Sequence, residues 1–364
     1  MRTLLSISIG TVWNKAWPII IAILFFGLII FIHELGHFIF AKLFKVKVNE
    51  FALGMGPTLF KIQGKETKYA LRLFPIGGFV SMEGEDEESE EEGSFSKKPV
   101  WQRMIIVVAG ATFNLILGLI ICSVILATSK GIATTKIDSF EKNSVSSQYG
   151  LQAGDKIVKI DGKRVYSSYD LSFLMQRSKD GVFDFVVERD GEKVQLNDVK
   201  FETKEIDGRN TIIYDFIVVG VKSSFKNVVK YSFGEATSIS RIVYLSLFDL
   251  ITGQYGLSDL SGPVGTVQII AEVAQDSVSK FDFSNLLMIM ALITINIGLF
   301  NLLPIPALDG GRFFFMLIEL IFRKPVPAKY ENWIHAAGLV LLLLFMAVVS
   351  FSDIWKLIQG KTYL

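Results

Sequence analysis

The chain has 364 residues, of which 51% are hydrophobic and 20% are charged, and its formal net charge is +1. A mean hydropathy of +0.44 exceeds that of an ordinary soluble domain and favours a membrane protein. The near-zero charge, without a basic segment interleaved with aromatic residues, argues against nucleic-acid binding. The single cysteine, Cys122, excludes an internal disulfide and lies in an apolar run, where packing explains it.

The first predicted element is a membrane-spanning helix. Residues 17–32 are uninterrupted apolar sequence, and with residues 38–44 they reach the roughly 20 residues that a helix needs to cross a bilayer. The run is too long for a signal peptide and lacks a cleavage site. Within it, FIHELGHFIF (31–40) places His33, Glu34 and His37. A charge at this depth costs about 2.5 to 3.5 kcal/mol on insertion scales, so these residues indicate a function.

The spacing of these three residues is typical of a zinc site. His33 and His37 are one helical turn apart, so both imidazoles can bind one ion from the same face. Zinc suits such a pair, and Glu34 can then act as general base toward a water molecule whose pKa the metal lowers to roughly 7. The cation would also compensate for the buried carboxylate.

The next segment contains an alternating stretch and an acidic one. ALRLFPIGGFV (70–80) could clamp an unwound peptide as an added strand, which makes Gly77, Gly78 and Phe79 substrate-binding candidates. EGEDEESEEE (83–92) is a block of like charges, which predicts a solvated and disordered loop.

Three further apolar runs, residues 104–129, 283–308 and 336–352, bring the expected number of transmembrane helices to about four. Lysine and arginine near the span ends are more frequent in residues 41–103 and 312–329, so these loops are predicted to be cytoplasmic. The long stretch from about 130 to 280 is then extracytoplasmic.

That stretch contains signals of an α+β domain. YGLQAGDKIVKIDGKRV (149–165) has turn glycines, an alternating strand and an Asp-Gly turn. SSYDLSFLMQRS (167–178) predicts a short helix, and GVFDFVVERDGEKVQL (181–196) predicts a hairpin. The pattern is similar to a bacterial PDZ domain, which binds peptides at a sheet edge, although a purely steric role stays open. Residues 225–250 predict an amphipathic helix along the membrane surface.

The third run ends in NIGLFNLLPIPALDGGR (296–312), where Pro304 and Pro306 interrupt the helix. Membranes tolerate unwound backbone only where it lines a cavity or is buried in protein, so Asp309 becomes the candidate third zinc ligand. Glu50 is too close to the histidines, and an interfacial position explains His335. The alternative is a helix that ends at the membrane surface in an Asp-Gly-Gly turn. Three asparagines are candidates to line the cavity and hold substrate backbone: Asn114, Asn296 and Asn301.

H-E-x-x-H in a first span and N-x-x-P-x-P-x-L-D-G in a later one resemble the motifs of the site-2 protease family of intramembrane zinc metalloproteases, in its bacterial regulator type with a single PDZ domain. Residues 301–310 fill every specified position of the second motif. Residues 51–60 and 71–86 are similar to the family's membrane-associated β-hairpin region, and SGPVG (261–265) resembles the segment before the third span. One departure is AGATFN (109–114), where Ala111 replaces a proline of the family's A-G-P-x-x-N.

The resemblance implies a polytopic α-helical membrane protein of about four transmembrane helices, with a membrane-associated β-hairpin region and an inserted α+β PDZ domain. It implies His33, His37 and Asp309 as Zn²⁺ ligands and Glu34 as the catalytic base. The expected division is 1–44 (first span), 45–100 (β-hairpin region and acidic loop), 101–129 (second span), 130–205 (PDZ domain), 206–282 (PDZ C-terminal region with the amphipathic helix), 283–312 (third span) and 313–364 (loop, fourth span and tail).

The expected function is hydrolysis of a peptide bond within the transmembrane segment of pre-trimmed single-span proteins, such as anti-sigma factors or remnant signal peptides. This is regulated intramembrane proteolysis in the bacterial inner (cytoplasmic) membrane, with the PDZ domain extracytoplasmic. Two alternatives stay open. One is a membrane-anchored PDZ scaffold with a non-catalytic metal site, and the other is a zinc protease that cuts outside the membrane.

Overall fold

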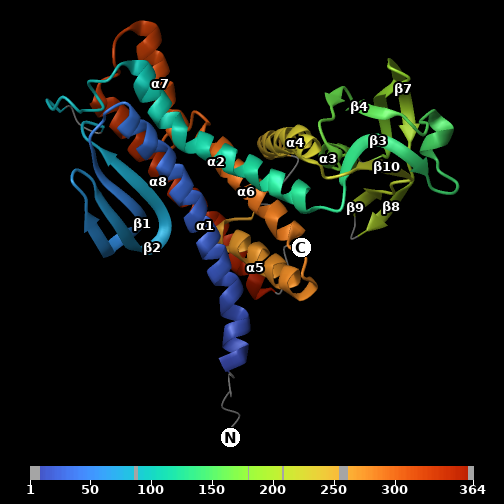
Figure 1. The fold of residues 1–364 in the computed structure, drawn as a ribbon, viewed down its shortest axis with the longest axis horizontal. Coiled ribbons are helices and arrows are strands. Elements are labelled where there is room, and N and C mark those ends of the chain that lie inside the picture. The colour runs from blue at the N-terminus through green and yellow to red at the C-terminus, as the bar shows by residue number, and fades with distance from the viewer. Residues whose placement is uncertain (1–8, 86–88, 179, 207–208, 254–260, 360–364) are drawn as a thin grey trace, which may run out of the picture. The chain divides into compact units, whose positions relative to one another are not determined.

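The computed structural model describes residues 9–85, 89–178, 180–206, 209–253 and 261–359 (Figure 1). The chain divides into two compact units. Residues 1–118 and 249–364 form the first, here called the membrane unit, and residues 119–248 form the second, here called the inserted unit.

The membrane unit is mainly helical. Its helices are α1 (Ile9–Leu43), α2 (Val100–Thr128, whose last turns belong to the inserted unit), α5 (Pro263–Lys280), α6 (Ser284–Asn301), α7 (Asp309–Phe322) and α8 (Ala328–Ile358). Among the described residues, four segments are long and apolar enough to cross a membrane: Ala16–Leu43, Val100–Thr128, Ser284–Asn301 and Lys329–Ile358. Large apolar side chains are exposed along α8, as expected for a surface that faces lipid. The expectation of about four spans is confirmed.

Helix boundaries differ from the sequence prediction around the third span. Helix α6 ends at Asn301, because Pro304 and Pro306 follow and lack backbone N–H groups. Asp309 was predicted on the unwound segment, but it is the first residue of the next helix, α7. Helix α5 was not predicted, since its apolar residues alternate with polar ones, although Pro263 at its start is a helix-initiation signal.

Small residues bring three of these helices close together. A Cβ added at Gly36 of α1 would lie 2.5 Å from the Ala109 carbonyl oxygen of α2. A Cβ at Gly298 of α6 would lie 3.1 Å from the carbonyl oxygen of Ala111, which is itself fully buried. Glycine therefore permits backbone contact on both sides of α2, as is usual at helix interfaces in membranes.

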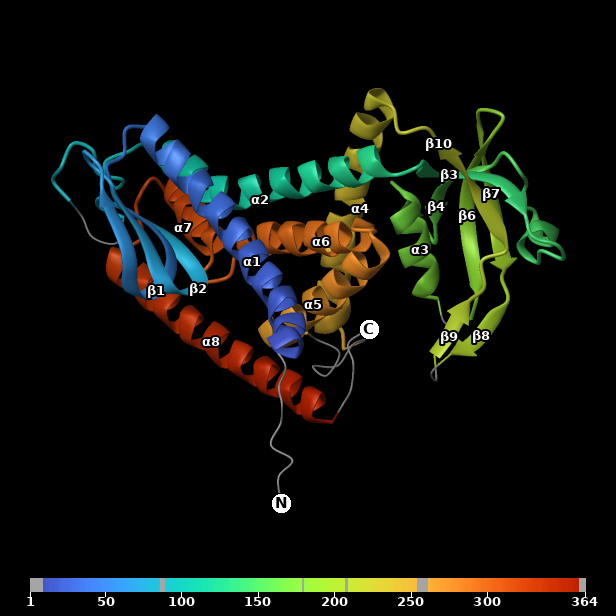
Figure 2. The same ribbon diagram turned by 60° about the horizontal axis from the view of Figure 1, so that its bottom comes forward.

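A small sheet lies along α1 (Figures 1 and 2). Strands β1 (Val48–Gln63) and β2 (Lys68–Met82) are antiparallel neighbours at the position of the predicted hairpin region. Both strands bend, and Phe51 is paired with Val80 as well as with Tyr69. The first half of β1 thus has neighbours on both sides, and its inward residues pack against the end of α1 and the start of α2.

The acidic loop was predicted to be solvated and disordered. Its residues 86–88 lie outside the described part of the chain. On either side, Glu85 pairs with Arg312, and Lys47 Nζ lies 2.6 Å from Glu91 Oε2. The described acidic residues are therefore partly held by ion pairs, of which the exposed Lys47–Glu91 pair contributes little to stability.

The inserted unit is built on a six-stranded sheet of order β10-β3-β4-β6-β7, with β5 paired to β4. Its strands are β3 (Ile132–Phe140), β4 (Lys156–Ile160), β5 (Lys163–Arg164), β6 (Val182–Arg189), β7 (Glu192–Lys200) and β10 (Phe216–Val221); β8 (Thr203–Ile206) and β9 (Arg209–Ile212) form a separate pair. The predicted strand, short helix (α3, Ser168–Gln176) and hairpin are present. Because β10 pairs with β3, the sheet extends beyond Glu205, the predicted end of the domain.

Helix α4 (Phe225–Ile251) occupies the predicted amphipathic segment and lies beside α3 within this unit (Figures 1 and 2). Its Arg241 pairs with Asp170, a fully buried residue of α3, and its Ser238 Oγ donates to Ser167 Oγ at 2.8 Å. These polar contacts attach α4 to the start of α3.

Candidate metal centre and active site

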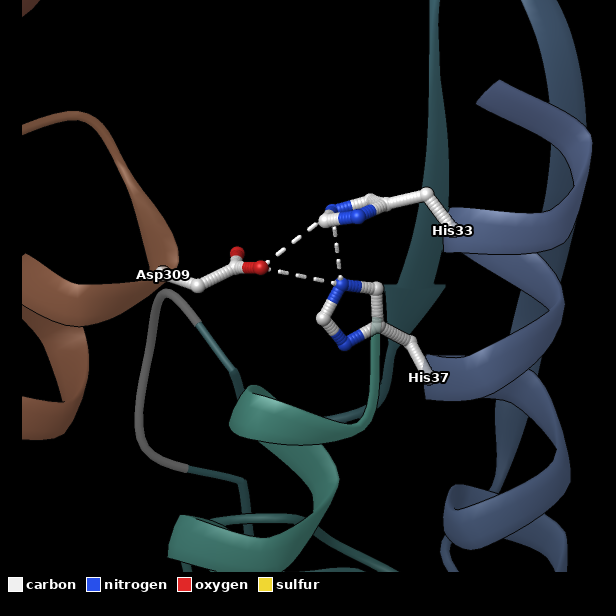
Figure 3. Close-up of side chains that lie close together, drawn as sticks. All are labelled: His33, His37 and Asp309. Carbon is white, nitrogen blue, oxygen red and sulfur yellow. Dashed lines mark hydrogen bonds and ion pairs between the residues drawn. The ribbon is translucent and has the colours of Figure 1, made fainter. Parts of the chain in front are cut away.

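The three predicted metal ligands meet at one point (Figure 3). His33 and His37 project from α1, and Asp309 projects from the first turn of α7. His33 Nε2 lies 3.2 Å from His37 Nε2, and Asp309 Oδ2 lies 3.2 Å from His33 Nε2 and 3.4 Å from His37 Nε2. Within the described ranges, this is the one group of three or more histidine, cysteine, aspartate or glutamate side chains that could hold a metal ion.

The spacing of these donor atoms fits zinc. Tetrahedral zinc with bonds of about 2.0 to 2.1 Å separates its ligand atoms by about 3.3 to 3.4 Å. His37 Nδ1 lies 2.9 Å from the Ile106 carbonyl oxygen and donates its proton there, so His37 Nε2 presents a lone pair. That lone pair faces a second imidazole nitrogen and a carboxylate oxygen. A cation at the centre would relieve the repulsion between these donors.

The segment between α6 and α7 places Asp309. It folds back on the start of α7, where a Cβ at Gly310 would clash with the Leu303 carbonyl oxygen and one at Gly311 would lie 2.5 Å from that of Ile305. Ala307 adopts a left-handed conformation, with φ of 74°. Glycine is therefore required directly after the ligand.

His335 of α8 supports this segment from the other side. Its Nδ1 accepts a hydrogen bond of 2.9 Å from the Ala307 N–H, which fixes the left-handed residue. The sequence suggested only an interfacial position for His335, whereas its side chain is 15% exposed and holds the backbone two residues before Asp309, a candidate ligand. A lone histidine in the first turns of an apolar helix was the available signal.

Glu34 is buried beside strand β2. It follows His33 on α1, and a Cβ at Gly78 would lie 2.9 Å from its Cγ and 3.0 Å from the Ala52 carbonyl oxygen. The backbone of β2 thus passes directly against the predicted general base. Of the neighbouring substrate-binding candidates, Gly77 has a positive φ of 76°, and the Phe79 ring receives the Arg72 guanidinium at 4.9 Å.

Gly110 of α2 also contributes to the site. A Cβ at this position would clash with His37 Nε2, the atom that faces the metal position. Sequence reasoning did not identify this role, although Gly110 is part of the AGATFN motif.

The three asparagines differ in position. Asn114 is fully buried, and its Nδ2 lies 3.3 Å from His33 Nδ1. Asn301 donates to the Ile297 carbonyl oxygen within its own helix at 3.0 Å, and Asn296 is partly buried on the same helix. Asn114 therefore contacts one of the three candidate metal ligands directly.

Comparison with known proteins shows matches over most of the chain. The family model described as Peptidase family M50 matches residues 21–345. A Fusobacterium nucleatum protein named "Putative zinc metalloprotease" is 37% identical over 349 residues, covering 93% of this chain and 98% of the relative. A Clostridium perfringens protein of the same description is 37% identical over 92% of this chain and 98% of its own length. The Bacillus subtilis "Regulator of sigma-W protease RasP" is 29% identical over 93% of this chain and 98% of its own length.

Proposed function

Because this chain belongs to peptidase family M50 and is a zinc metalloprotease, we propose that it hydrolyses a peptide bond within the transmembrane segment of single-span membrane proteins. The observation that carries this proposal is the position of the site in the chain. His33, Glu34 and His37 lie inside Ala16–Leu43, a helical segment apolar enough to span the membrane. A catalytic centre within such a segment is suited to a scissile bond at membrane depth.

The proposed roles follow from the geometry. His33 Nε2, His37 Nε2 and Asp309 Oδ2 would hold the zinc ion. When bound, the ion would activate a water molecule and polarise the scissile carbonyl. Glu34 accepts the proton of the attacking water and later donates it to the leaving amine, so that the C–N bond breaks with the proton balance closed.

The sheet beside α1 supports a route for the substrate. The second half of β2, Gly78 to Met82, pairs with β1 along one edge. Among the described residues, no strand pairs with its opposite edge. We propose that an unwound substrate segment adds there as a strand, with Gly77, Gly78 and Phe79 binding it next to Glu34. The exposed apolar side chains of the sheet, such as Phe60 and Ile62, support its association with the membrane.

The substrate class is proposed from the relatives. The name "Regulator of sigma-W protease" links one relative to control of a sigma factor, which supports anti-sigma factors as substrates here, with remnant signal peptides as a second class. The chain is an integral membrane protein. We place it in the bacterial inner membrane, with residues 41–103 and 312–329 cytoplasmic.

The inserted unit is proposed to be an extracytoplasmic PDZ domain. Strand β10 lies at one edge of its sheet, and α3 packs against the same sheet near β3. This arrangement suits peptide binding by strand addition. It would follow that the unit excludes bulky extracytoplasmic domains and admits substrates that have already been trimmed.

The test is a comparison of wild-type protein with Glu34→Gln and Asp309→Ala, purified in detergent, for zinc content and for cleavage of a single-span reporter. Glu34→Gln is expected to keep zinc but lose cleavage, since Glu34 is not a ligand. Asp309→Ala is expected to lose zinc, because two histidines leave the metal under-coordinated.

Mass spectrometry of the products separates the alternatives. A cut inside the hydrophobic stretch of the reporter supports the proposal, whereas a cut outside it indicates a juxtamembrane protease. If the wild-type protein binds zinc but cuts the reporter at neither position, the result would indicate a scaffold with a non-catalytic metal site. Turnover by Glu34→Gln would remove Glu34 from the mechanism.

A further inference from the structure

We infer that Asn114 is a positioning residue for the metal site: its side-chain carbonyl holds the proton of His33 on Nδ1, so that His33 Nε2 is free to bind zinc. The inference rests on the proposed zinc site but not on which peptide bond is cut. Asn114 lies on α2 and has no exposed surface, and its Nδ2 lies 3.3 Å from His33 Nδ1.

The chemistry of imidazole ligation creates the requirement. A neutral histidine that binds metal through Nε2 carries its proton on Nδ1 and needs an acceptor there. For His37 the acceptor is the Ile106 backbone carbonyl. For His33, Asn114 is the corresponding group, and both acceptors come from one face of α2, with Gly110 midway between them.

The orientation of the Asn114 amide distinguishes two states. When Asn114 Nδ2 points toward His33, it donates a hydrogen bond to His33 Nδ1. His33 then carries its proton on Nε2, which lies 3.2 Å from Asp309 Oδ2 and can donate to it. In this orientation Asn114 Oδ1 is buried with no hydrogen-bond partner in the described structure. Amide nitrogen and oxygen are assigned from the surrounding hydrogen bonds, and a half-turn exchanges them. With Oδ1 toward His33, Nδ1–H donates to it, and Nε2 presents its lone pair to the metal.

Asn114 is thus suited to both protonation arrangements of His33. An asparagine can accept from or donate to the same nitrogen, whereas an aspartate only accepts and a leucine does neither. This difference makes the role testable through metal binding itself. Loss of comparable outer hydrogen-bond partners lowers metal affinity by about 10- to 100-fold.

The experiment measures zinc affinity of the full-length protein in detergent by competition with a chelator, together with the visible absorption spectrum of the Co²⁺-substituted protein. Asn114→Leu, of similar size and without an acceptor, is expected to lower zinc affinity by about 10- to 100-fold and to change the Co²⁺ spectrum. Asn114→Asp is expected to retain zinc affinity, because the acceptor is kept. Thr112→Val is the matched control, since Thr112 is exposed and its hydroxyl donates to the Val108 carbonyl oxygen of its own helix.

Three outcomes would overturn the inference. One is wild-type zinc affinity and an unchanged Co²⁺ spectrum in Asn114→Leu. Another is an equal loss of zinc affinity in the Leu and Asp variants while both fold, which would show that Asn114 contributes only through packing. If Asn114→Leu does not fold, Asn114→Ala removes the amide without added bulk and leaves no acceptor, and wild-type affinity in that variant is the third. A wild-type protein that binds zinc without proteolysis would contradict the proposed function but leave this inference standing.

Discussion

At the scale of single residues, the metal site depends on positions that carry no side chain. Gly36 lets α1 approach the Ala109 carbonyl of α2, and Gly110 leaves room for the His37 imidazole. His37 then reaches the Ile106 carbonyl, and His33 reaches Asn114. Close contact between the two helices is therefore a condition for the orientation of His33 and His37.

The Gly110→Ala variant tests this dependence. The added methyl group would clash with His37 Nε2, so the imidazole must leave the metal position. We expect zinc affinity to fall by at least about tenfold and reporter cleavage to be lost with it. Gly27→Ala on α1 is the control, because a Cβ there meets no atom within 4 Å. Full zinc content in the purified Gly110→Ala protein would contradict the prediction.

The three residues that meet at the candidate metal site could be named from the sequence, but most of the contacts that support them could not. His33, Glu34 and His37 share one helical stretch, so their spacing alone places two ligands on one face. Asp309 was predicted as the third ligand because prolines interrupt the span that precedes it. The contacts of Gly110 with His37 and of His335 with Ala307 join residues far apart in the chain. A pattern in one segment carries no information on such pairs.

At the scale of elements, the second half of β2 has one edge without a strand neighbour among the described residues, and it contacts α1, the helix that carries His33, Glu34 and His37. Gly78 pairs with Leu53 on one side, and its α-carbon faces Glu34 and Ile30 of α1. On the proposed substrate route, the strand would fix where a substrate backbone lies relative to Glu34. A side chain at this position would move either the strand or Glu34.

The Gly78→Ala variant is expected to lower kcat by about 100-fold while zinc content stays at the wild-type level. A Cβ would lie 2.9 Å from Glu34 Cγ, and displacement of a catalytic group by about 1 Å costs about this much. Gly220→Ala in β10 is the control, because that strand position has open space. Rates for Gly78→Ala within a factor of about two of wild type would show that the contact is not needed.

Elements were predictable where composition alone decides them. The apolar runs gave four spans, and Asp-Gly pairs gave turns, as the positive φ angles of Asp161, Gly162, Asp190 and Gly191 show. Helix α5 was missed because its burial depends on packing against α1 and α8 rather than on its own hydrophobicity. The pairing of β10 with β3 was missed for the same reason, since partner strands are not encoded locally.

At the scale of the whole molecule, the chain joins an ordinary α+β unit to a membrane protease by insertion. The sheet begins at Ile132, shortly after α2, and ends at Val221, shortly before α4. These two residues are direct partners in the register of β3 and β10. The unit therefore enters and leaves at adjacent points, which makes it removable with a short linker.

Removing residues 132–221 in favour of a short glycine-serine linker tests the proposed steric filter. If the inserted unit excludes bulky extracytoplasmic domains, the deletion variant should cleave a full-length single-span substrate that the wild type refuses. Cleavage of the trimmed form should change much less, because the metal ligands and Glu34 lie in the membrane unit. The measurement is the ratio of the two cleavage rates in each protein, with zinc content checked in both.

The control carries the same linker inserted after Gly191, at the exposed tip of the β6–β7 hairpin, where the sheet stays intact and the wild-type ratio is expected. A deletion variant that still refuses the full-length substrate while cutting the trimmed one would show that size exclusion by this unit is not the filter. Loss of both activities with normal zinc content would instead assign the unit a structural role in the active protein. If the deletion variant cleaves the full-length substrate and the linker control does not, the bulk of the inserted unit is what delays the intramembrane cut until the substrate has been trimmed. No specific peptide would need to bind the unit for this order to hold.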